Sequence, residues 1–171
     1  EFRGRTDIHT HSAALCWAAC DRLSKIAFKL GLNDRADYWG AKAKQLRGEI
    51  ITRAWNPKLN SFVSTFDGNN LDASLLLLHE IGFIAPNDQK FMSTVDAITR
   101  ELYANGHVFR YKTADDFGHP ETTFTICTFW YIDALAAIGQ LAEARKLFEN
   151  LLSCRNHLGL LSEDYDIKRG E

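Results

Sequence analysis

Apolar residues recur every three or four positions along most of this chain, and this helical periodicity restricts the possible folds more than any other feature. The first apolar stripe predicts a helix that ends near Gly31, and Asn33 can cap a second helix. The first stripe consists of Leu15, Ala19, Leu23, Ile26 and Leu30, and the second of Ala36, Trp39, Ala43, Leu46, Ile50 and Ala54. The amino-terminal third is therefore predicted to form two successive amphipathic helices.

Four further helices are predicted in the rest of the chain. A third, at about residues 72–81, contains four consecutive leucines, Leu75 to Leu78, which are apolar on every side of a helix and predict burial on several sides. Asn87 or Asp88 can cap a fourth helix, which ends before Gly106. Its apolar face consists of Phe91, Val95, Ile98 and Leu102. A fifth helix is expected at about residues 121–138 and a sixth at about 141–153. Two loops are predicted, at residues 57–70 and 106–120, and the first contains a short extended piece at 61–65.

Six helices in three successive pairs make an all-α fold. Strand signals are too sparse for an α/β fold, and no repeat is strong enough to define a named solenoid. Two architectures fit this pattern: a superhelical array of helix pairs, or half of a toroid of paired helices. The length of 171 residues suits one domain.

Charge and cysteine content exclude several classes of function. The balance of 20 Lys and Arg against 22 Asp and Glu argues against nucleic-acid binding, which needs a basic face. No apolar run is long enough to cross a membrane, and no signal peptide is visible. The four cysteines, Cys16, Cys20, Cys127 and Cys154, are interpreted as small buried thiols, which favours a reducing, cytoplasmic compartment.

The two ends of the chain suggest a fragment. It opens on Glu1-Phe-Arg without a methionine and stops at Lys168-Arg-Gly-Glu171 in a predicted loop. We therefore expect a piece of a larger domain.

Acidic residues in aromatic loops are the candidates for chemistry. Hydrolysis of a glycosidic bond needs two carboxyl groups that flank the bond. Carboxylates lie among aromatic residues and arginines in three loops, at residues 1–5, 109–124 and 160–166. The pattern His9-Thr-His11 resembles a metal-binding pair, but no third ligand follows at a useful spacing, so no metal is expected. Asp72 is interpreted as a helix cap.

Several motifs, in the same order along the chain, are similar to those of glycoside hydrolase family 15. They are Glu1-Phe-Arg-Gly with His9-Thr-His-Ser12 and Cys16-Trp-Ala-Ala-Cys-Asp-Arg22, then Leu71-Asp-Ala-Ser-Leu-Leu-Leu-Leu78 with Gly82-Phe83, then Arg110-Tyr111 with Glu121-Thr-Thr-Phe-Thr-Ile-Cys-Thr-Phe-Trp130, and finally Gly159-Leu-Leu-Ser-Glu163. The family includes glucoamylases, glucodextranases and some trehalases. The resemblance implies an (α/α)6 toroid, of which residues 1–171 form a partial catalytic domain that lacks the amino-terminal half and the last helix.

The resemblance also implies the catalytic pair. Glu1 matches the glutamate of the family's general-acid loop, and Glu163 matches the general base. In an inverting enzyme the two carboxyl groups stand about 6.5–9.5 Å apart, which leaves room for the attacking water. Glu1 then needs a raised pKa, so that it is protonated near neutral pH.

Substrate-binding residues are implied in the same way. Arg110, with Tyr111 beside it, resembles the family arginine that binds hydroxyls of the terminal glucose; the alternative is a surface arginine paired with Asp115 or Asp116. Phe124 falls where some relatives carry an aromatic residue in the pocket wall, and a core position is the alternative. Glu121 matches a glutamate that precedes glycine in relatives, but here Thr122 follows it. Arg3 either supports the acid loop or binds substrate.

The expected function is removal of glucose from the non-reducing end of α-glucosides with inversion. A glucoamylase-type substrate, an α-glucan or oligosaccharide, comes first and trehalose second; neither requires a cofactor. The alternative from another class is a non-catalytic regulatory or carbohydrate-binding homologue of the toroid. Because the inner helices of a partial toroid, notably Leu75 to Leu78, would expose apolar surface, the 171-residue chain alone is expected to self-associate.

Overall fold

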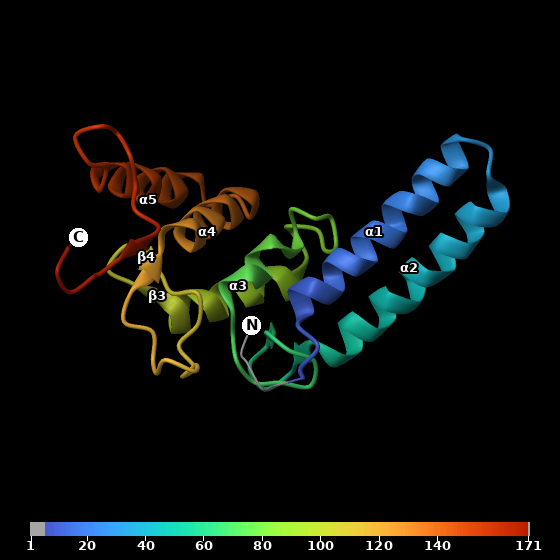
Figure 1. Cartoon of the computed structure of the whole chain (residues 1–171), viewed down its shortest axis with the longest axis horizontal. Helices are drawn as coiled ribbons and strands as arrows, with labels where there is room; N and C mark the ends of the chain where they lie inside the picture. Colours follow the sequence, from blue (N-terminus) through green and yellow to red (C-terminus); the bar gives the residue numbers. More distant parts are fainter. Residues whose placement is uncertain (1–5, 171) are drawn as a thin grey trace.

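A computed structural model describes residues 6–170 and shows a long helical hairpin that projects from a helical body (Figure 1). The hairpin consists of α1 (Thr10–Lys29) and α2 (Asn33–Arg53), which run antiparallel. The body contains the 3₁₀ helix η1 (Ala73–Leu78), α3 (Gln89–Leu102), α4 (Thr125–Ala137) and α5 (Leu141–Ser153). The all-α prediction is confirmed.

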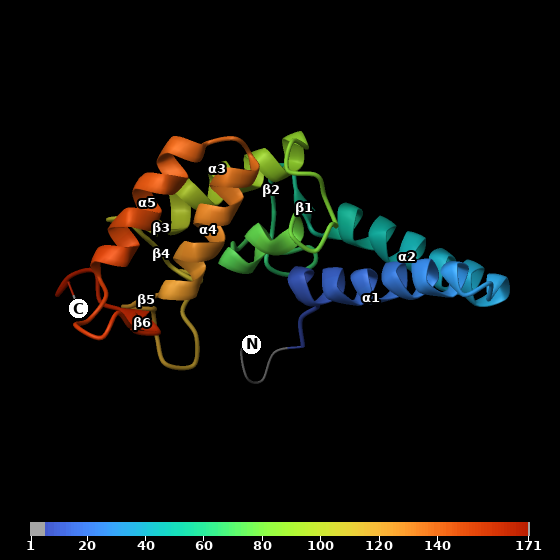
Figure 2. The same cartoon turned by 90° about the horizontal axis from the view of Figure 1, so that it is seen from above.

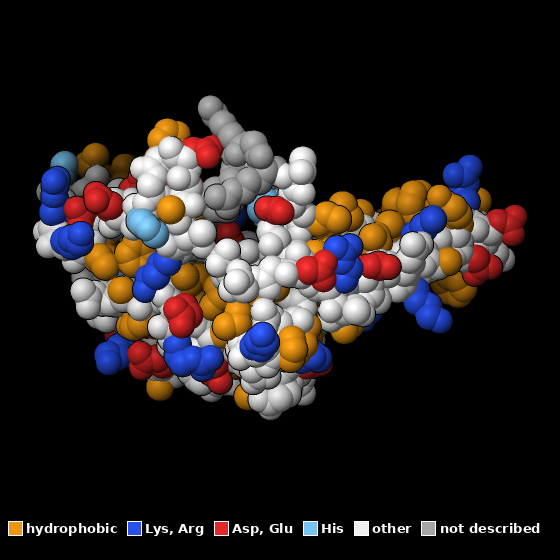
Figure 3. Space-filling view, turned by 90° about the horizontal axis from the view of Figure 1, so that it is seen from below, with side chains coloured by type: hydrophobic (Ala, Val, Ile, Leu, Met, Phe, Trp, Pro, Cys, Tyr) orange, Lys and Arg blue, Asp and Glu red, His pale blue; other side chains and the backbone are white. Residues whose placement is uncertain are grey.

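The apolar stripe predicted for the first helix does form one face of α1, but this face points into solvent. Leu15, Leu23, Ile26 and Leu30 are 41–68% exposed. The buried side of α1 instead carries Ala14, Trp17, Ala18 and Ala27. Small side chains allow the two helices to approach closely: Ser24 donates a hydrogen bond to the carbonyl of Ala36 in α2, at 2.8 Å. Figure 3 shows the hydrophobic side chains gathered along the projecting hairpin.

The stripe predicted for α2 is confirmed. Ala36, Ala43 and Ile50 are buried within the helix, and Ala54 is buried where it ends. The predicted cap at Asn33 is wrong by one residue: Leu32 occupies the cap position without a side-chain hydrogen bond, and Asn33 is the first residue of α2.

The third helix is shorter than predicted. It covers Ala73–Leu78 rather than 72–81, because the chain turns after Leu78 through Gly82, whose φ of 75° is a left-handed conformation that favours glycine. The predicted burial is confirmed, since Leu75, Leu76 and Leu78 are fully enclosed. The expectation that these leucines expose apolar surface in the isolated chain is therefore wrong, because they pack into the hydrophobic core of the body.

Helix α3 agrees with the prediction from sequence. The Asp88 carboxylate caps it by accepting a hydrogen bond from the backbone N–H of Lys90 at 2.8 Å. Its predicted apolar face is fully buried: Phe91, Val95, Ile98 and Leu102. Figure 2 shows α3, α4 and α5 grouped at one end of the molecule, away from the hairpin.

Three short antiparallel ribbons connect the helices. They pair β1 (Trp55–Asn56) with β2 (Ser61–Phe62), β3 (Tyr103–Ala104) with β4 (His107–Val108), and β5 (Thr123–Phe124) with β6 (Asp164–Tyr165). The last ribbon corrects the fifth predicted helix, which begins at Thr125 rather than 121. The reason is tertiary, because Thr123 and Phe124 extend to pair with a segment forty residues further along.

The cysteines differ from the prediction of buried thiols. Cys127 is buried, but Cys16 is exposed and Cys20 and Cys154 are half-buried; all four are free thiols. Between residues 6 and 170, no helix combines the length and apolar character that crossing a membrane requires.

Candidate active site

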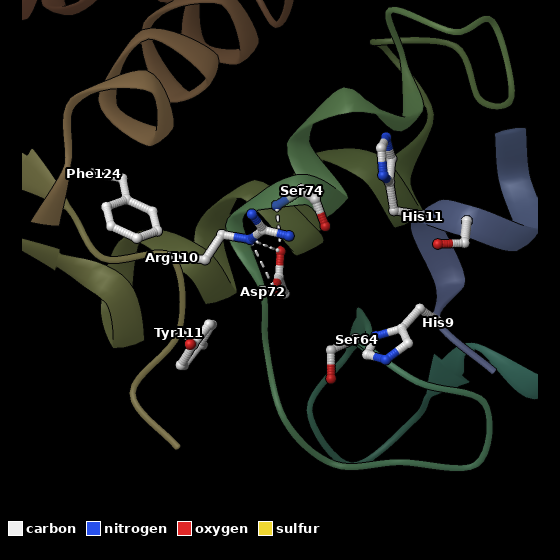
Figure 4. A pocket seen from close by; sticks show the side chains of 9 residues that line it. His9, His11, Ser64, Asp72, Ser74, Arg110, Tyr111 and Phe124 are labelled. Carbon is white, nitrogen blue, oxygen red and sulfur yellow. Dashed lines mark hydrogen bonds and ion pairs between the residues drawn. The ribbon is translucent and has the colours of Figure 1, made fainter. Parts of the chain in front are cut away.

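A cavity of about 200 Å³ lies where the hairpin meets the body (Figure 4). Its lining comes from five separate segments: the start of α1, the loop after β2, the start of η1, the loop after β4, and β5. The lining residues are His9, His11, Ser12, Ser64, Asp72, Ser74, Arg110, Tyr111 and Phe124.

Backbone hydrogen bonds hold these segments together. The N–H of Thr10 donates to the carbonyl of Ser64 at 2.9 Å, and the buried Thr10 hydroxyl donates to the carbonyl of Val63 at 2.6 Å. On the other side of the cavity, the N–H of Ala73 donates to the carbonyl of Arg110 at 2.8 Å. The relative positions of these segments are thus set by the backbone together with one buried hydroxyl, that of Thr10.

Arg110 and Asp72 form an ion pair at the centre of the cavity. The Arg110 Nε lies 2.9 Å from Asp72 Oδ1 and 3.0 Å from Oδ2, and Oδ1 also accepts a hydrogen bond from the N–H of Ser74 at 2.8 Å. The alternative pairing of Arg110 with Asp115 or Asp116 is wrong. Asp72 does cap η1, as predicted, but it also lies in the cavity, which the sequence analysis missed.

Tyr111 lines the cavity and is oriented by Asp115. Its hydroxyl donates to Asp115 Oδ2 at 2.8 Å. Burial, followed by the hydrogen bond to Asp115, raises the pKa of Tyr111 to about 12. The phenol is therefore neutral at physiological pH and acts as a hydrogen-bond donor toward Asp115.

Phe124 is a wall of the cavity and not a core residue, since 36% of its surface is exposed. It lies in β5, directly opposite Asp164 of β6. In Figure 4 the rings of Phe124 and Tyr111 stand on one side of the Arg110–Asp72 pair, and His9, His11 and Ser64 stand on the other. The arrangement provides aromatic surface on one side and hydrogen-bonding groups on the other, which suits a ligand with both C–H and hydroxyl groups.

Glu163 is held beside this wall by the backbone. Its carbonyl accepts a hydrogen bond from the N–H of Thr125 at 2.8 Å, and the next residue, Asp164, pairs with Phe124. The Glu163 side chain is exposed and is not part of the cavity lining. The structure thus brings Glu163 and Phe124 together at one edge of the cavity.

One predicted site residue that the structure describes, Glu121, is not brought together with these. Glu121 is exposed and does not line the cavity. Glu1 and Arg3 lie outside the described residues, so the predicted separation of the two catalytic carboxyl groups is not measured.

The pattern His9-Thr-His11 contributes to the cavity in a way that the sequence analysis did not anticipate. Both histidines line it, and no group of three or more His, Cys, Asp and Glu side chains suited to a metal occurs in the part of the chain that the structure describes. Burial lowers the pKa of His11, although Asp72 raises it and Arg110 lowers it further. A neutral imidazole donates one hydrogen bond and accepts another, as sugar hydroxyls do.

The all-α fold of this chain is also found in solved structures of glycosidases. A wild-type glycosidase of solved structure superimposes with a TM-score of 0.78 at 20% identity, over 91% of this chain and 41% of that one. A glycosidase variant in complex with glucose gives 0.77 at 18% identity, over 90% and 40%. The helices of this chain are therefore part of a helical toroid of the glycosidase type.

The family follows from the whole sequence. The sequence model described as "Glycosyl hydrolases family 15" matches residues 1–171. The chain belongs to glycoside hydrolase family 15.

Similar family members carry the name trehalase. The chain is 37% identical to a trehalase of Thermoplasma volcanium, over 100% of this chain and 28% of that protein. It is 36% identical to a trehalase of Mycobacterium tuberculosis, over 99% of this chain and 25% of that protein. The chain thus spans less than a third of the length of these relatives.

Proposed function

We propose that the full-length protein containing this chain is an inverting glycosidase that hydrolyses trehalose. The observation that carries the proposal is the identity of 36–37%, over the whole chain, to proteins named trehalase. This reverses the order of substrates given by the sequence analysis, in which glucoamylase-type substrates came first. Residues 1–171 are proposed to be part of the catalytic domain.

Glu163 is proposed as the general base and Glu1 as the general acid. Support for Glu163 comes from its motif and from its backbone position beside the cavity wall, next to Phe124. Glu1 rests on its motif alone. In this mechanism Glu163, ionised, removes a proton from a water molecule that attacks the anomeric carbon, while Glu1 protonates the departing oxygen.

Arg110, Tyr111 and Phe124 are proposed to hold the terminal glucose unit. The Arg110 guanidinium offers donors in a fixed fork, which suits adjacent hydroxyl oxygens, and the Phe124 ring offers a face for sugar C–H groups. Arg3 is proposed to act beside Glu1. Glu121 receives no role, because it is exposed outside the cavity.

Proton NMR of the full-length protein with trehalose tests the proposal. Trehalose joins two α-glucosyl units through their anomeric carbons, so inversion at one of them releases β-glucose from that unit and α-glucose from the leaving unit. Equal initial amounts of the two anomers are expected. Initial release of α-glucose alone would indicate retention and contradict the proposed roles.

Two variants make this test specific. Glu163→Gln removes the base and is expected to lower kcat by about 10²- to 10⁴-fold. Glu149→Gln, an exposed glutamate on α5, is the matched control and is expected to leave kcat unchanged. Cleavage of maltose but not trehalose would favour the glucoamylase-type substrate. Cleavage of neither by a folded protein would favour the regulatory homologue.

A further inference from the structure

We infer that Asp72 is a positioning residue that fixes the guanidinium of Arg110, so that the two terminal nitrogens of Arg110 are presented to the substrate. The inference rests on the proposed function, in which Arg110 binds the terminal glucose. It gives a substrate-related task to a residue that the sequence marks only as a helix cap.

The contact between the two side chains uses only one edge of the guanidinium. Asp72 approaches Nε, with Oδ1 at 2.9 Å and Oδ2 at 3.0 Å. Across residues 6–170, no hydrogen bond involves the two Nη atoms of Arg110. Figure 4 shows the pair between the aromatic side of the cavity and the histidine side. The Nη edge is therefore the part of Arg110 that remains for a ligand.

Asp72 is itself held in place from two directions. Its Oδ1 accepts the N–H of Ser74 at 2.8 Å, which attaches the carboxylate to the first turn of η1. The backbone of the following residue, Ala73, donates to the carbonyl of Arg110 at 2.8 Å. The two residues are thus connected by side chains and by backbone, which limits the orientations that the guanidinium can adopt.

A third contact restricts the plane of the guanidinium. Its carbon atom lies 5.8 Å from the centre of the Trp130 ring in α4, within the range of a cation–π interaction. Asp72 fixes one edge and Trp130 lies against the group, so rotation about the end of the side chain is restricted.

The chemistry favours an indirect role for Asp72. Its two oxygens already accept hydrogen bonds from Arg110 and Ser74, and its side chain is only 16% exposed, against 38% for Arg110. Of the pair, Arg110 is the more accessible to a sugar. A charge-assisted contact to Nε is stronger than one from a neutral amide, so an ionised carboxylate is the suitable partner.

The test replaces Asp72 with asparagine in the full-length protein and measures hydrolysis of trehalose. We expect kcat/KM to fall by about 10- to 100-fold, because a displaced guanidinium no longer meets the sugar hydroxyls. The loss is expected mainly in KM, since these contacts exist in both the ground state and the transition state. A wild-type KM and kcat would overturn the inference.

Asp88→Asn is the matched control. Asp88 caps α3 through Lys90 at 2.8 Å, as Asp72 caps η1 through Ser74, but it has no ion pair with an arginine among the described residues and does not line the cavity. Both variants exchange a capping carboxylate for an amide, whose oxygen can still accept the backbone N–H, and only Asp72→Asn is expected to change KM. An equal loss of activity in both would show that capping explains the effect, which would overturn the inference.

A double-variant cycle separates positioning from direct binding. If Asp72 acts through Arg110, Asp72→Asn combined with Arg110→Gln is expected to match Arg110→Gln alone. An additional loss of 10-fold or more in the double variant would show that Asp72 acts on its own and would overturn the inference.

Two further measurements cover the remaining outcomes. If Asp72→Asn fails to fold, Arg110→Lys is measured instead, because lysine keeps the positive charge but lacks the forked guanidinium. A KM within about threefold of the wild-type value would overturn the inference. If the wild type cleaves no sugar, the proposed function is wrong, and activity cannot be used to test Asp72. Calorimetry then compares the affinity of the wild type and of Asp72→Asn for glucose. Equal affinities, or no binding by the wild type, would then overturn the inference.

Discussion

Three buried or half-buried histidines share one electrostatic property at the residue scale. Burial lowers the pKa of His11, His79 and His107, and for each it is the largest influence. His107 is the clearest case, because its Nδ1 is buried without a hydrogen-bond partner among the described residues. The His107 ring stacks on the ring of Tyr165, with 4.1 Å between the two ring centres. Tyr165 lies two residues after Glu163 in the chain.

Stability is therefore expected to decrease as the solution becomes acidic. A histidine whose pKa is lowered by folding binds its proton more readily when unfolded, so the free energy of unfolding is greatest above about pH 6.5 and falls as the pH drops below that value. Urea unfolding of the full-length protein at pH 7.5 and at pH 5 measures this change.

His107→Phe keeps a ring against Tyr165 and removes one titrating group, so the loss of stability between pH 7.5 and pH 5 is expected to shrink. His157→Phe, at an exposed position, serves as the control. An equal pH dependence in the wild type and His107→Phe would mean that the buried ring does not resist protonation.

The ribbon of β5 and β6 is the element that determines where Glu163 lies. The buried Thr123 pairs with Tyr165, and its hydroxyl donates to the carbonyl of Tyr165 at 3.2 Å. The N–H of Thr125, the first residue of α4, donates to the carbonyl of Glu163. The position of the proposed base thus depends on one strand pair and one helix terminus.

Replacing Thr125 with proline tests this dependence. Proline is tolerated at the first position of a helix, so the change removes the N–H that binds Glu163 while the helix persists. Phe124, with φ −85° and ψ 123°, already has a conformation compatible with a following proline. We expect stability to fall by about 1 kcal/mol and kcat by about tenfold.

Gln89→Pro is the matched control, because Gln89 is the first residue of α3 and Asp88 before it has φ −71° and ψ 131°. Its activity is expected to equal that of the wild type. A Thr125→Pro variant with unchanged kcat would show that Glu163 does not need this anchor or is not the base.

The exposed face of α1 is the main feature at the scale of the whole molecule. Leu15, Leu23, Ile26 and Leu30 lie on this face of α1, are 41–68% exposed and are covered by no described element. Figure 3 shows hydrophobic side chains gathered along the projecting hairpin. A contiguous apolar surface of this kind is unfavourable in water and favours association.

Residues 1–171 produced alone are therefore expected to self-associate. Size-exclusion chromatography with light scattering measures the mass, and Leu23→Glu with Ile26→Glu is expected to reduce the association. Leu158→Glu, at an exposed leucine in the loop after α5, is the control and should leave it unchanged. A monodisperse monomer that hydrolyses trehalose would contradict this expectation.

Much of the fold was predictable because helices depend on neighbours within a few residues. The Asp88 cap, the buried face of α3 and the bounds of α5 (Leu141–Ser153) follow from local spacing. The start of α4 could not be predicted from local spacing, because residues 123–124 form a strand with residues 164–165, far along the chain. Family motifs identified Arg110, Tyr111 and Phe124 as site residues, and the structure brings these three to one cavity.

The sequence by itself determined the helical class, the order of the helices and the family, since these depend on periodicity and motifs along the chain. Tertiary structure decided that Asp72 pairs with Arg110, 38 residues away, that His9 and His11 line a cavity, and that the apolar face of α1 points outward. The physical reason is that contacts between distant segments depend on how whole elements pack, which no local pattern specifies.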